Sequence, residues 1–181
     1  MPLLAAGEID LIVGRLYEPA VPDGFEREPL WAEPISALAR VGHPIFLAPK
    51  IDVEDLARYD LVLPTVTQRV GQEIDRLLER LGLSATTAHR SSSYGFIREM
   101  LHGGDYLSIM PRLMMVGDLL RGTLRLVPLP IPSPERPAGL IRPRDRGSPP
   151  AARVFIEVLR GYVGELAERG LADITIGTSG R

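Results

Sequence analysis

Two threonines and an arginine gather where a strand is expected to pass into a helix, near the middle of this chain of 181 residues. Thr65, Thr67 and Arg69 follow a short apolar run that ends in proline and precede a stretch with helical spacing. Hydroxyls, exposed backbone amides and a guanidinium at the start of a helix suit a carboxylate, a phosphate or a sugar hydroxyl. We therefore expect a ligand site here. The alternative is that Thr67 only caps the helix and Arg69 is solvated.

A second group of hydroxyls, Ser91, Ser92 and Ser93, stands in the equivalent place before the next predicted helix. Serine is a preferred N-cap, so one of the three is expected to do no more than cap that helix. We expect at least one of the three to be a candidate for ligand contact, although capping is the commoner use of serine at such a position.

The segment from Gly7 to Arg15 supplies a third candidate group. Its run Ile9–Val13 is nearly all apolar, which predicts a strand buried on both faces of a parallel sheet. Gly14 and Arg15 would then lie just past the carboxyl end of that strand, where open α/β sheets bind ligands. We expect Arg15 to pair with an anionic ligand there; the alternative is an exposed loop arginine.

Other kinds of chemistry find no support in the residues. The chain has no cysteine, which excludes disulfides and thiolate sites. His43, His89 and His102 lack metal-ligand spacing, so structural or solvent roles are expected. Glu8 and Asp10 would point to opposite faces of a strand, which makes a poor acid–base pair. We therefore expect no enzyme activity, no cofactor and no metal.

Net charge and hydropathy narrow the class further. A net charge of −2 and a pI near 5.9 argue against a broad nucleic-acid footprint on this chain. No apolar run approaches the roughly 18 residues needed to span a membrane, and the amino terminus does not resemble a secretion signal. The expected protein is soluble and cytoplasmic.

The periodicity of apolar residues predicts an α/β protein. Strand–loop–helix units between residues 60 and 122 connect successive strands through helices, which predicts a parallel sheet there. The last helix, about Pro150 to Arg169, is expected to bury one face, made of Phe155, Val158, Leu159, Tyr162 and Leu166.

The central strand–helix block is inserted between an α/β beginning and an α/β end. This order predicts two lobes joined by two crossing strands, with a ligand in the crevice between them. The expected divisions are residues 1–37 and 128–169 for lobe I, 38–127 for lobe II and 170–181 for a tail.

The order of several short segments resembles the effector-binding domain of LysR-type transcriptional regulators. No single motif is specific, and the resemblance depends on their order and spacing over about residues 5 to 168. The segments are Gly7–Leu11, Glu28–Ile35, Gly42–Pro44, Asp105–Pro111, Gly122–Leu124 and the closing helix.

This resemblance implies a two-lobed, type 2 periplasmic-binding-protein-like α/β fold with mainly parallel sheets and two crossover strands. It implies a sensor of a small-molecule effector, a sugar or an organic acid, that controls transcription as a homodimer or homotetramer. Promoter DNA would be bound through an N-terminal helix-turn-helix domain, which is missing here together with the first part of the effector domain. The alternative is a solute-binding protein of a transport system with the same fold.

Overall fold

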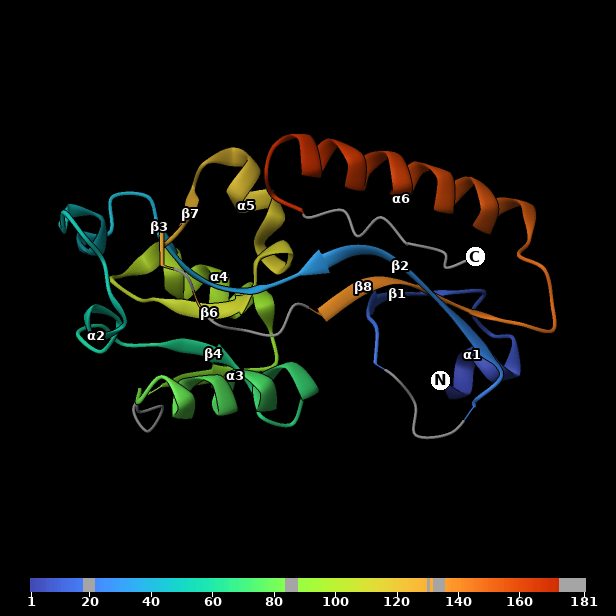
Figure 1. The fold of residues 1–181 in the computed structure, drawn as a ribbon, viewed down its shortest axis with the longest axis horizontal. Coiled ribbons are helices and arrows are strands. Elements are labelled where there is room, and N and C mark those ends of the chain that lie inside the picture. Colours follow the sequence, from blue (N-terminus) through green and yellow to red (C-terminus); the bar gives the residue numbers. More distant parts are fainter. Residues whose placement is uncertain (18–21, 84–87, 130, 132–135, 173–181) are drawn as a thin grey trace, which may run out of the picture. The chain divides into compact units, whose positions relative to one another are not determined.

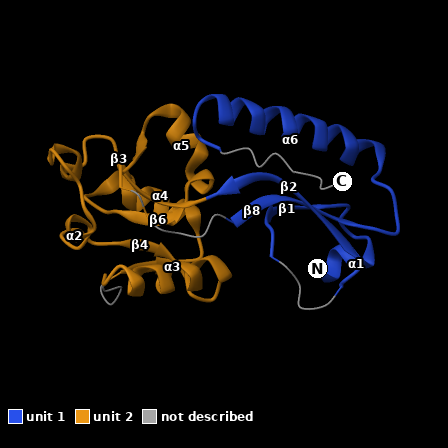
Figure 2. Cartoon of the chain, in the orientation of Figure 1, with its two compact units in different colours: residues 1–33, 135–181 blue, residues 34–134 orange. Residues whose placement is uncertain are grey.

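In the computed structural model of the chain, residues 1–17, 22–83, 88–129, 131 and 136–172 are described (Figure 1). The chain divides into two compact units. Unit 1 consists of residues 1–33 and 135–181, and unit 2 consists of residues 34–134 (Figure 2). The chain therefore passes from one unit to the other twice.

The core of unit 1 is a three-stranded sheet in the order β1-β8-β2, with both pairings antiparallel. The strands are β1 (Ile12–Arg15), β2 (Phe25–Glu33) and β8 (Arg136–Pro143). Leu140 of β8 is fully buried between its two neighbours, since it pairs with Val13 on one side and Glu28 on the other. The β2–β8 register shifts at a bulge between Pro29 and Trp31, because a proline cannot donate a ladder hydrogen bond.

The prediction of a parallel strand buried on both faces at Ile9–Val13 is wrong. Ile9 and Asp10 precede β1, and Val13 within it remains 38% exposed. An antiparallel sheet tolerates one partly solvated face, whereas a parallel sheet rarely does. Gly14 and Arg15 consequently lie inside the strand, and not past its end.

Two helices cover opposite faces of this sheet. In α1 (Pro2–Ala6), Leu4 packs against Ile141 of β8, and the helix ends at Gly7 with a left-handed φ of 77°. In α6 (Pro150–Glu168), Arg160 forms an ion pair of 2.5 Å with Glu28 of β2. Because Glu28 pairs with Leu140, the neighbour of Ile141 in β8, side-chain alternation places α1 and α6 on different faces.

The buried face of α6 differs from the predicted one. Its four buried residues are Ala152, Ile156, Val163 and Leu166, so Leu166 was placed correctly, and the predicted Leu159 is half-buried. Val158 is 66% exposed, and Phe155 and Tyr162 are exposed as well. At about 100° per residue, the exposed stripe of Phe155, Val158 and Tyr162 is centred roughly a quarter turn around the helix from the stripe of the four buried residues. The helix is apolar over a wide arc, and the sequence pattern alone did not determine which part of that arc packs.

Unit 2 contains a mixed sheet built from two ladders. The order β6-β3-β7 is antiparallel, β4 and β5 are parallel, and a parallel bridge between Leu61 and Leu107 joins the two ladders. The strands are β3 (Ile35–Arg40), β4 (Val62–Pro64), β5 (His89–Ser91), β6 (Ser108–Pro111) and β7 (Leu124–Leu126).

The helices of unit 2 follow the strands as their sequence pattern predicts. In α3 the apolar positions Val70, Ile74, Leu77 and Leu78 are buried, and in α4 Ile97 and Leu101 are buried. These helices and turns are η1 (Pro44–Leu47), α2 (Val53–Leu56), α3 (Arg69–Arg80), α4 (Tyr94–Gly103), η2 (Arg112–Met115) and α5 (Val116–Arg121).

The expectation of parallel strands over residues 60 to 122 is confirmed, because β4 runs parallel to β5 and, through the Leu61–Leu107 bridge, to the strand that leads into β6. The broader expectation of mainly parallel sheets is wrong, because the pairings of β1, β2, β3, β7 and β8 are antiparallel. The sequence also predicts a short strand near residues 86–88, of which residues 86 and 87 lie outside the described residues, and β5 begins at His89. Among the described residues, no helix is both long enough and apolar enough to cross a membrane.

His43 is a buried polar side chain in unit 2, with 1% of its surface exposed. Its Nδ1 accepts a hydrogen bond of 3.1 Å from the Ile45 amide, which caps η1, and its ring packs edge-on against Tyr59 with centroids 4.6 Å apart. Burial lowers the pKa of His43, and the charge of Arg40 adds to this while Asp105 opposes it. The imidazole is therefore protonated less readily in the folded protein than in the unfolded chain.

Acid is expected to destabilise the fold through His43. The unfolded chain takes up a proton below its ordinary pKa of about 6.5, whereas the folded state resists protonation, so stability falls as pH drops below that value. The loss approaches about 1.4 kcal/mol per pH unit at most. Urea unfolding between pH 7.5 and 5 measures it. In His43→Asn, which keeps a cap acceptor, the slope between pH 6.5 and 5 should largely disappear; an unchanged slope would contradict this assignment.

Candidate functional site

The carboxyl ends of β4 and β5 lie next to each other at one edge of the unit 2 sheet. In the parallel register Pro64 pairs with Ser91, and the Thr65 amide donates a hydrogen bond of 3.1 Å to the Ser91 carbonyl. The two predicted polar groups, which are 26 positions apart in the chain, are brought side by side by this pairing. Ligands bind at this edge in open α/β sheets.

The loop before α3 leaves its polar groups open to solvent. The Thr67 hydroxyl donates to the Thr65 hydroxyl over 3.4 Å, and the Gln68 amide donates to the Thr65 carbonyl over 3.2 Å. The N-cap of α3 is Gln68, and its side chain makes no capping hydrogen bond. The alternative that Thr67 only caps the helix is therefore wrong. Arg69 is the first residue of α3 and is exposed.

The three serines before α4 have different roles. Ser93 is the N-cap, and its Oγ accepts a hydrogen bond of 3.2 Å from the Phe96 amide. The Ser91 Oγ accepts from the Ser93 amide over 3.1 Å, which fixes the turn. Ser92 is exposed, and its hydroxyl makes no hydrogen bond to the rest of the described chain. One serine caps the helix as expected, and Ser92 is left available to a ligand.

Two residues that the sequence did not single out link the candidate loops. The Tyr94 hydroxyl, at the start of α4, donates to Gln68 Oε1 at the start of α3 over 3.4 Å. Val66 and Phe96 are exposed beside them, with 41% and 47% of their surface accessible. The junction therefore offers apolar as well as hydroxyl surface. Their positions immediately beside the predicted groups were the only available signal in the sequence.

Arg90 holds the two junctions in register. Its guanidinium donates to the Pro64 carbonyl over 3.2 Å and forms an ion pair with Asp75 of α3. One side chain of β5 therefore binds both the end of β4 and the helix that follows it. Arg90 is a positioning residue for the loop at Thr65.

Gly71 lets α3 approach this loop closely. A Cβ atom at Gly71 would lie 2.1 Å from the Thr65 carbonyl oxygen and 2.6 Å from its carbon. Contacts this short cannot be relieved by a side-chain rotation, because both atoms belong to the backbone. Glycine is therefore required at this position for the helix and the Thr65 loop to stay packed together.

Gly14 and Arg15 lie in β1 of unit 1, whereas the threonines, Arg69 and the serines lie in unit 2. The structure thus brings six of the eight predicted residues together. The participation of Gly14 and Arg15 in the same site stays a prediction.

The other histidines make packing or ionic contacts. His89 meets the Tyr106 ring edge-on at 5.7 Å, and His102 Nε2 lies 3.2 Å from Asp118 Oδ1. Burial opposes ionisation of Asp118, but hydrogen bonds from Arg121, His102 and Thr123 outweigh it and lower the pKa of this carboxyl. Within the described part of the chain, no group of three or more His, Cys, Asp or Glu residues is arranged to hold a metal ion.

Solved structures of other proteins have a similar arrangement of strands and helices. The crystal structure of HinK, a LysR family transcriptional regulator from Pseudomonas aeruginosa, is 25% identical and has a TM-score of 0.66, covering 91% of this chain and 56% of HinK. The effector binding domain of QuiR is 19% identical with a TM-score of 0.65, covering 89% of this chain and 75% of that domain. The chain therefore has the type 2 periplasmic-binding-protein-like α/β fold.

The sequence places the chain within one family. Residues 1–164 match the LysR substrate binding domain, and the chain belongs to this family. It is 29% identical over 165 residues to the HTH-type transcriptional regulator PcaQ of Agrobacterium fabrum, covering 90% of this chain and 53% of PcaQ. It is 27% identical to the HTH-type transcriptional regulator GalR of Pseudomonas putida, covering 91% of this chain and 41% of GalR. The chain thus spans about half the length of these relatives.

Replacing Gly71 by alanine should loosen the site. The new methyl group overlaps the Thr65 backbone, so we expect a loss of about 1–3 kcal/mol in the free energy of unfolding. The matched control is Gly161→Ala in α6, where a Cβ meets no atom within 4 Å. There the same change should stabilise by about 0.5–1 kcal/mol, because alanine favours helix. Thermal unfolding of both variants measures the two effects. Similar stabilities of the two variants would refute the close approach of α3 to the Thr65 backbone.

Proposed function

We propose that this chain is the sensing part of a LysR-type transcriptional regulator, which binds a small-molecule effector and thereby controls transcription. Membership in the family and the matches to PcaQ and GalR support this proposal. Contact with promoter DNA would be made by a helix-turn-helix domain that is not among the described elements. A regulator of this kind acts in the cytoplasm, where its promoter DNA lies.

The proposed effector site is the double junction at the ends of β4 and β5. The observation that carries it is the start of α3, where no side chain caps the helix and the hydroxyls of Thr65 and Thr67 are close by. Uncapped amides at a helix start carry a partial positive charge and bind anions. Arg69 adds a full positive charge, and Ser92 adds a hydroxyl from the neighbouring junction.

This set of groups favours a hydroxylated organic acid over a neutral sugar. A carboxylate matches the α3 amides and Arg69, while ring or chain hydroxyls match Thr67 and Ser92. Structures of the same fold support an acidic ligand: the QuiR effector binding domain is in complex with shikimate, and the CcmR regulatory domain is in complex with 2-PG.

Control of transcription requires more than binding. An effector shifts the balance between two states of a regulator only if it binds one of them more tightly. We propose that the two states differ in the arrangement of the two units, between which the chain passes twice. Gly14 and Arg15 of unit 1 are proposed to contact the effector in the state that it favours.

The competing functions have less support. A solute-binding protein of a transport system would share the fold, but the relatives found are transcriptional regulators. We propose that the chain is not an enzyme, because the candidate junctions carry hydroxyls and a guanidinium but no acid–base pair.

The organic-acid proposal predicts how binding responds to substitution. Calorimetry with a panel of hydroxylated carboxylic acids, shikimate included, and of neutral sugars should find its tightest ligands among the acids. Arg69→Gln should weaken the best ligand about tenfold, because a charge-assisted hydrogen bond is lost. Ser92→Ala should weaken it about threefold, since one neutral hydrogen bond contributes less.

The matched control is Arg76→Gln, which removes the same charge from an exposed position two turns further along α3. Its affinity should equal that of the unmodified chain, and thermal unfolding checks that all three variants are folded. Equal weakening in Arg69→Gln and Arg76→Gln would show that only net charge matters and would refute the site. Tighter binding of sugars would refute the ligand class.

Self-association is part of the same proposal, as a homodimer or homotetramer. The exposed apolar side chains of α6, among them Val158 and Phe155, support it, because such a stripe is costly to leave in water. Sedimentation velocity should show a species larger than a monomer that dissociates on dilution. A monomer over the whole accessible concentration range would contradict the prediction.

A further inference from the structure

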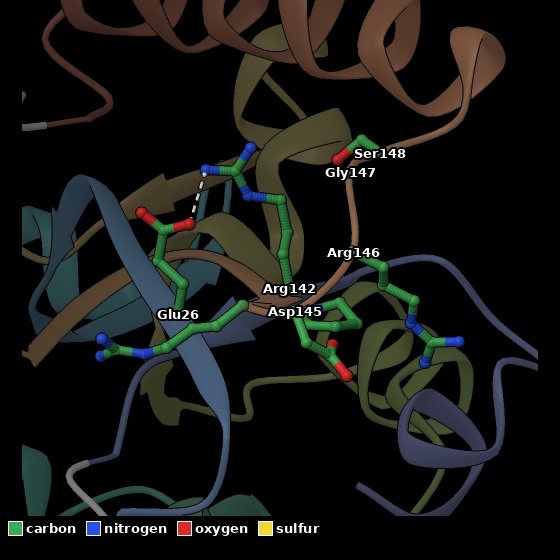
Figure 3. Close-up of a pocket in the computed structure, with 8 residues that line it drawn as sticks. Glu26, Arg142, Asp145, Arg146, Gly147 and Ser148 are labelled. Atoms are coloured by element: carbon green, nitrogen blue, oxygen red, sulfur yellow. Dashed lines mark hydrogen bonds and ion pairs between the residues drawn. The ribbon is translucent and has the colours of Figure 1, made fainter.

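A pocket of about 260 Å³ lies in unit 1, where β8 passes into α6. Figure 3 shows the labelled side chains of Glu26, Arg142, Arg146 and Ser148 around it, with the ion pair between Glu26 and Arg142 drawn as a dashed line. All of its residues belong to unit 1, so it is separate from the junctions at Thr65 and Ser92. The lining residues are Glu26, Arg142, Pro143, Arg144, Asp145, Arg146, Gly147 and Ser148.

The charges of this pocket do not cancel. Three arginines face two carboxylates, those of Glu26 and Asp145, which leaves one positive charge in excess. Arg142 is paired with Glu26 at 3.3 Å and, outside the lining, with Glu28 at 2.7 Å. Among the lining residues, Arg144 and Arg146 are therefore left with one carboxylate, that of Asp145.

Arg144 and Arg146 have no carboxylate partner among the described residues. The Arg144 Nε donates to the Phe25 carbonyl over 3.4 Å, and its terminal nitrogens make no further described contact. Arg146 donates to the carbonyls of Leu4 and Ala5 at the end of α1, the latter over 3.4 Å. Both guanidinium groups are thus held in place by backbone oxygens, and neither forms an ion pair within the described part of the chain.

A buried donor of Arg142 also lacks a partner. Its Nε is inaccessible to solvent, and none of the described groups accepts a hydrogen bond from it. A buried unpaired donor is costly and is normally satisfied by water or a ligand oxygen.

The geometry points to a second ligand site here, for a small oxyanion such as a phosphate or carboxylate group. Guanidinium groups bind such anions through paired hydrogen bonds, and Gly147 and Ser148, which also line the pocket, carry an amide and a hydroxyl as further donor groups. The 19-residue helix α6 begins two residues after Ser148, so its positive end adds to the field.

The size and polarity of the pocket limit the ligand. Its volume is below the range of about 300–1,000 Å³ of pockets for drug-sized molecules, so it accommodates an ion or one anionic group of a larger molecule. Arginines and carboxylates dominate the lining, which disfavours apolar ligands. Since Arg144 and Arg146 are exposed, salt will screen the attraction.

The probe for the test is inorganic phosphate, titrated against sodium chloride of equal ionic strength. Saturable shifts of the Gly147 and Ser148 amide signals in NMR spectra are expected with phosphate and not with chloride. Arg144→Gln should raise the dissociation constant for phosphate about fivefold, because a charged donor is lost from an exposed site. Titration with citrate in place of phosphate tells whether a carboxylate is the preferred group.

The matched control is Arg169→Gln, which removes one charge at the far end of α6, 19 residues of helix away. It should bind phosphate as the unmodified chain does.

The proposal is overturned if phosphate gives no saturable shifts at Gly147 and Ser148, or if both variants weaken binding equally. Binding of duplex DNA that depends on Arg144, without binding of phosphate, would overturn it in favour of a nucleic-acid surface. Signals of Thr67 and Ser92 report the other site, so the two proposals can fail separately.

Discussion

The parallel pairing of β4 with β5 is the constraint on which the candidate effector site depends. It sets Pro64 opposite Ser91, so that two loops from distant parts of the chain emerge at one edge of the sheet. The hydrogen bond from the Thr65 amide to the Ser91 carbonyl extends the pairing into the loops themselves. A shift of register by one residue would turn the alternating side chains to the other face and separate the two hydroxyl groups.

Side chains and helix packing then fix what the sheet has brought together. Arg90 ties the end of β4 to α3, and Gly71 lets α3 approach the Thr65 carbonyl without a clash. The start of α3, where we propose that the effector binds, is therefore positioned from both sides. Ser93 uses its own hydroxyl to cap α4, whereas no side chain caps α3, and this is why the proposal assigns the anionic group of the effector to α3.

The features of the fold and of the candidate site that could be predicted from the sequence are those that depend on residues close together in the chain. The existence of α3 and α4 followed from apolar residues at helical spacing, and the candidate group Ser91–Ser93 followed from the short polar interval between a strand and a helix. Parallel pairing over residues 60 to 122 followed from connections that contain a helix. The prediction of a parallel strand buried on both faces at Ile9–Val13 failed, because an apolar run of this length is equally compatible with a half-exposed antiparallel strand.

Contacts between residues that are far apart in the chain could not be predicted from local sequence patterns. Nothing local distinguishes Gln68 from other loop residues until Tyr94 is seen to donate to it. In α6, Ile156 and Val158 have similar hydropathy, yet the former is buried and the latter is exposed. Which part of a helix that is apolar over a wide arc becomes buried depends on the sheet against which it packs, and the sequence of the helix does not contain that information.

The two proposed anion sites follow from the two kinds of sheet. In unit 2, parallel strands end at the same edge, so two strand–helix junctions meet and backbone amides can bind a ligand. In unit 1, β8 is antiparallel to both neighbours, and its carboxyl end at Pro143 lies beside the start of β2 at Phe25. Only one described helix begins at that edge. An anion site there must draw its positive charge from side chains, and the interval after β8 supplies it through Arg144 and Arg146.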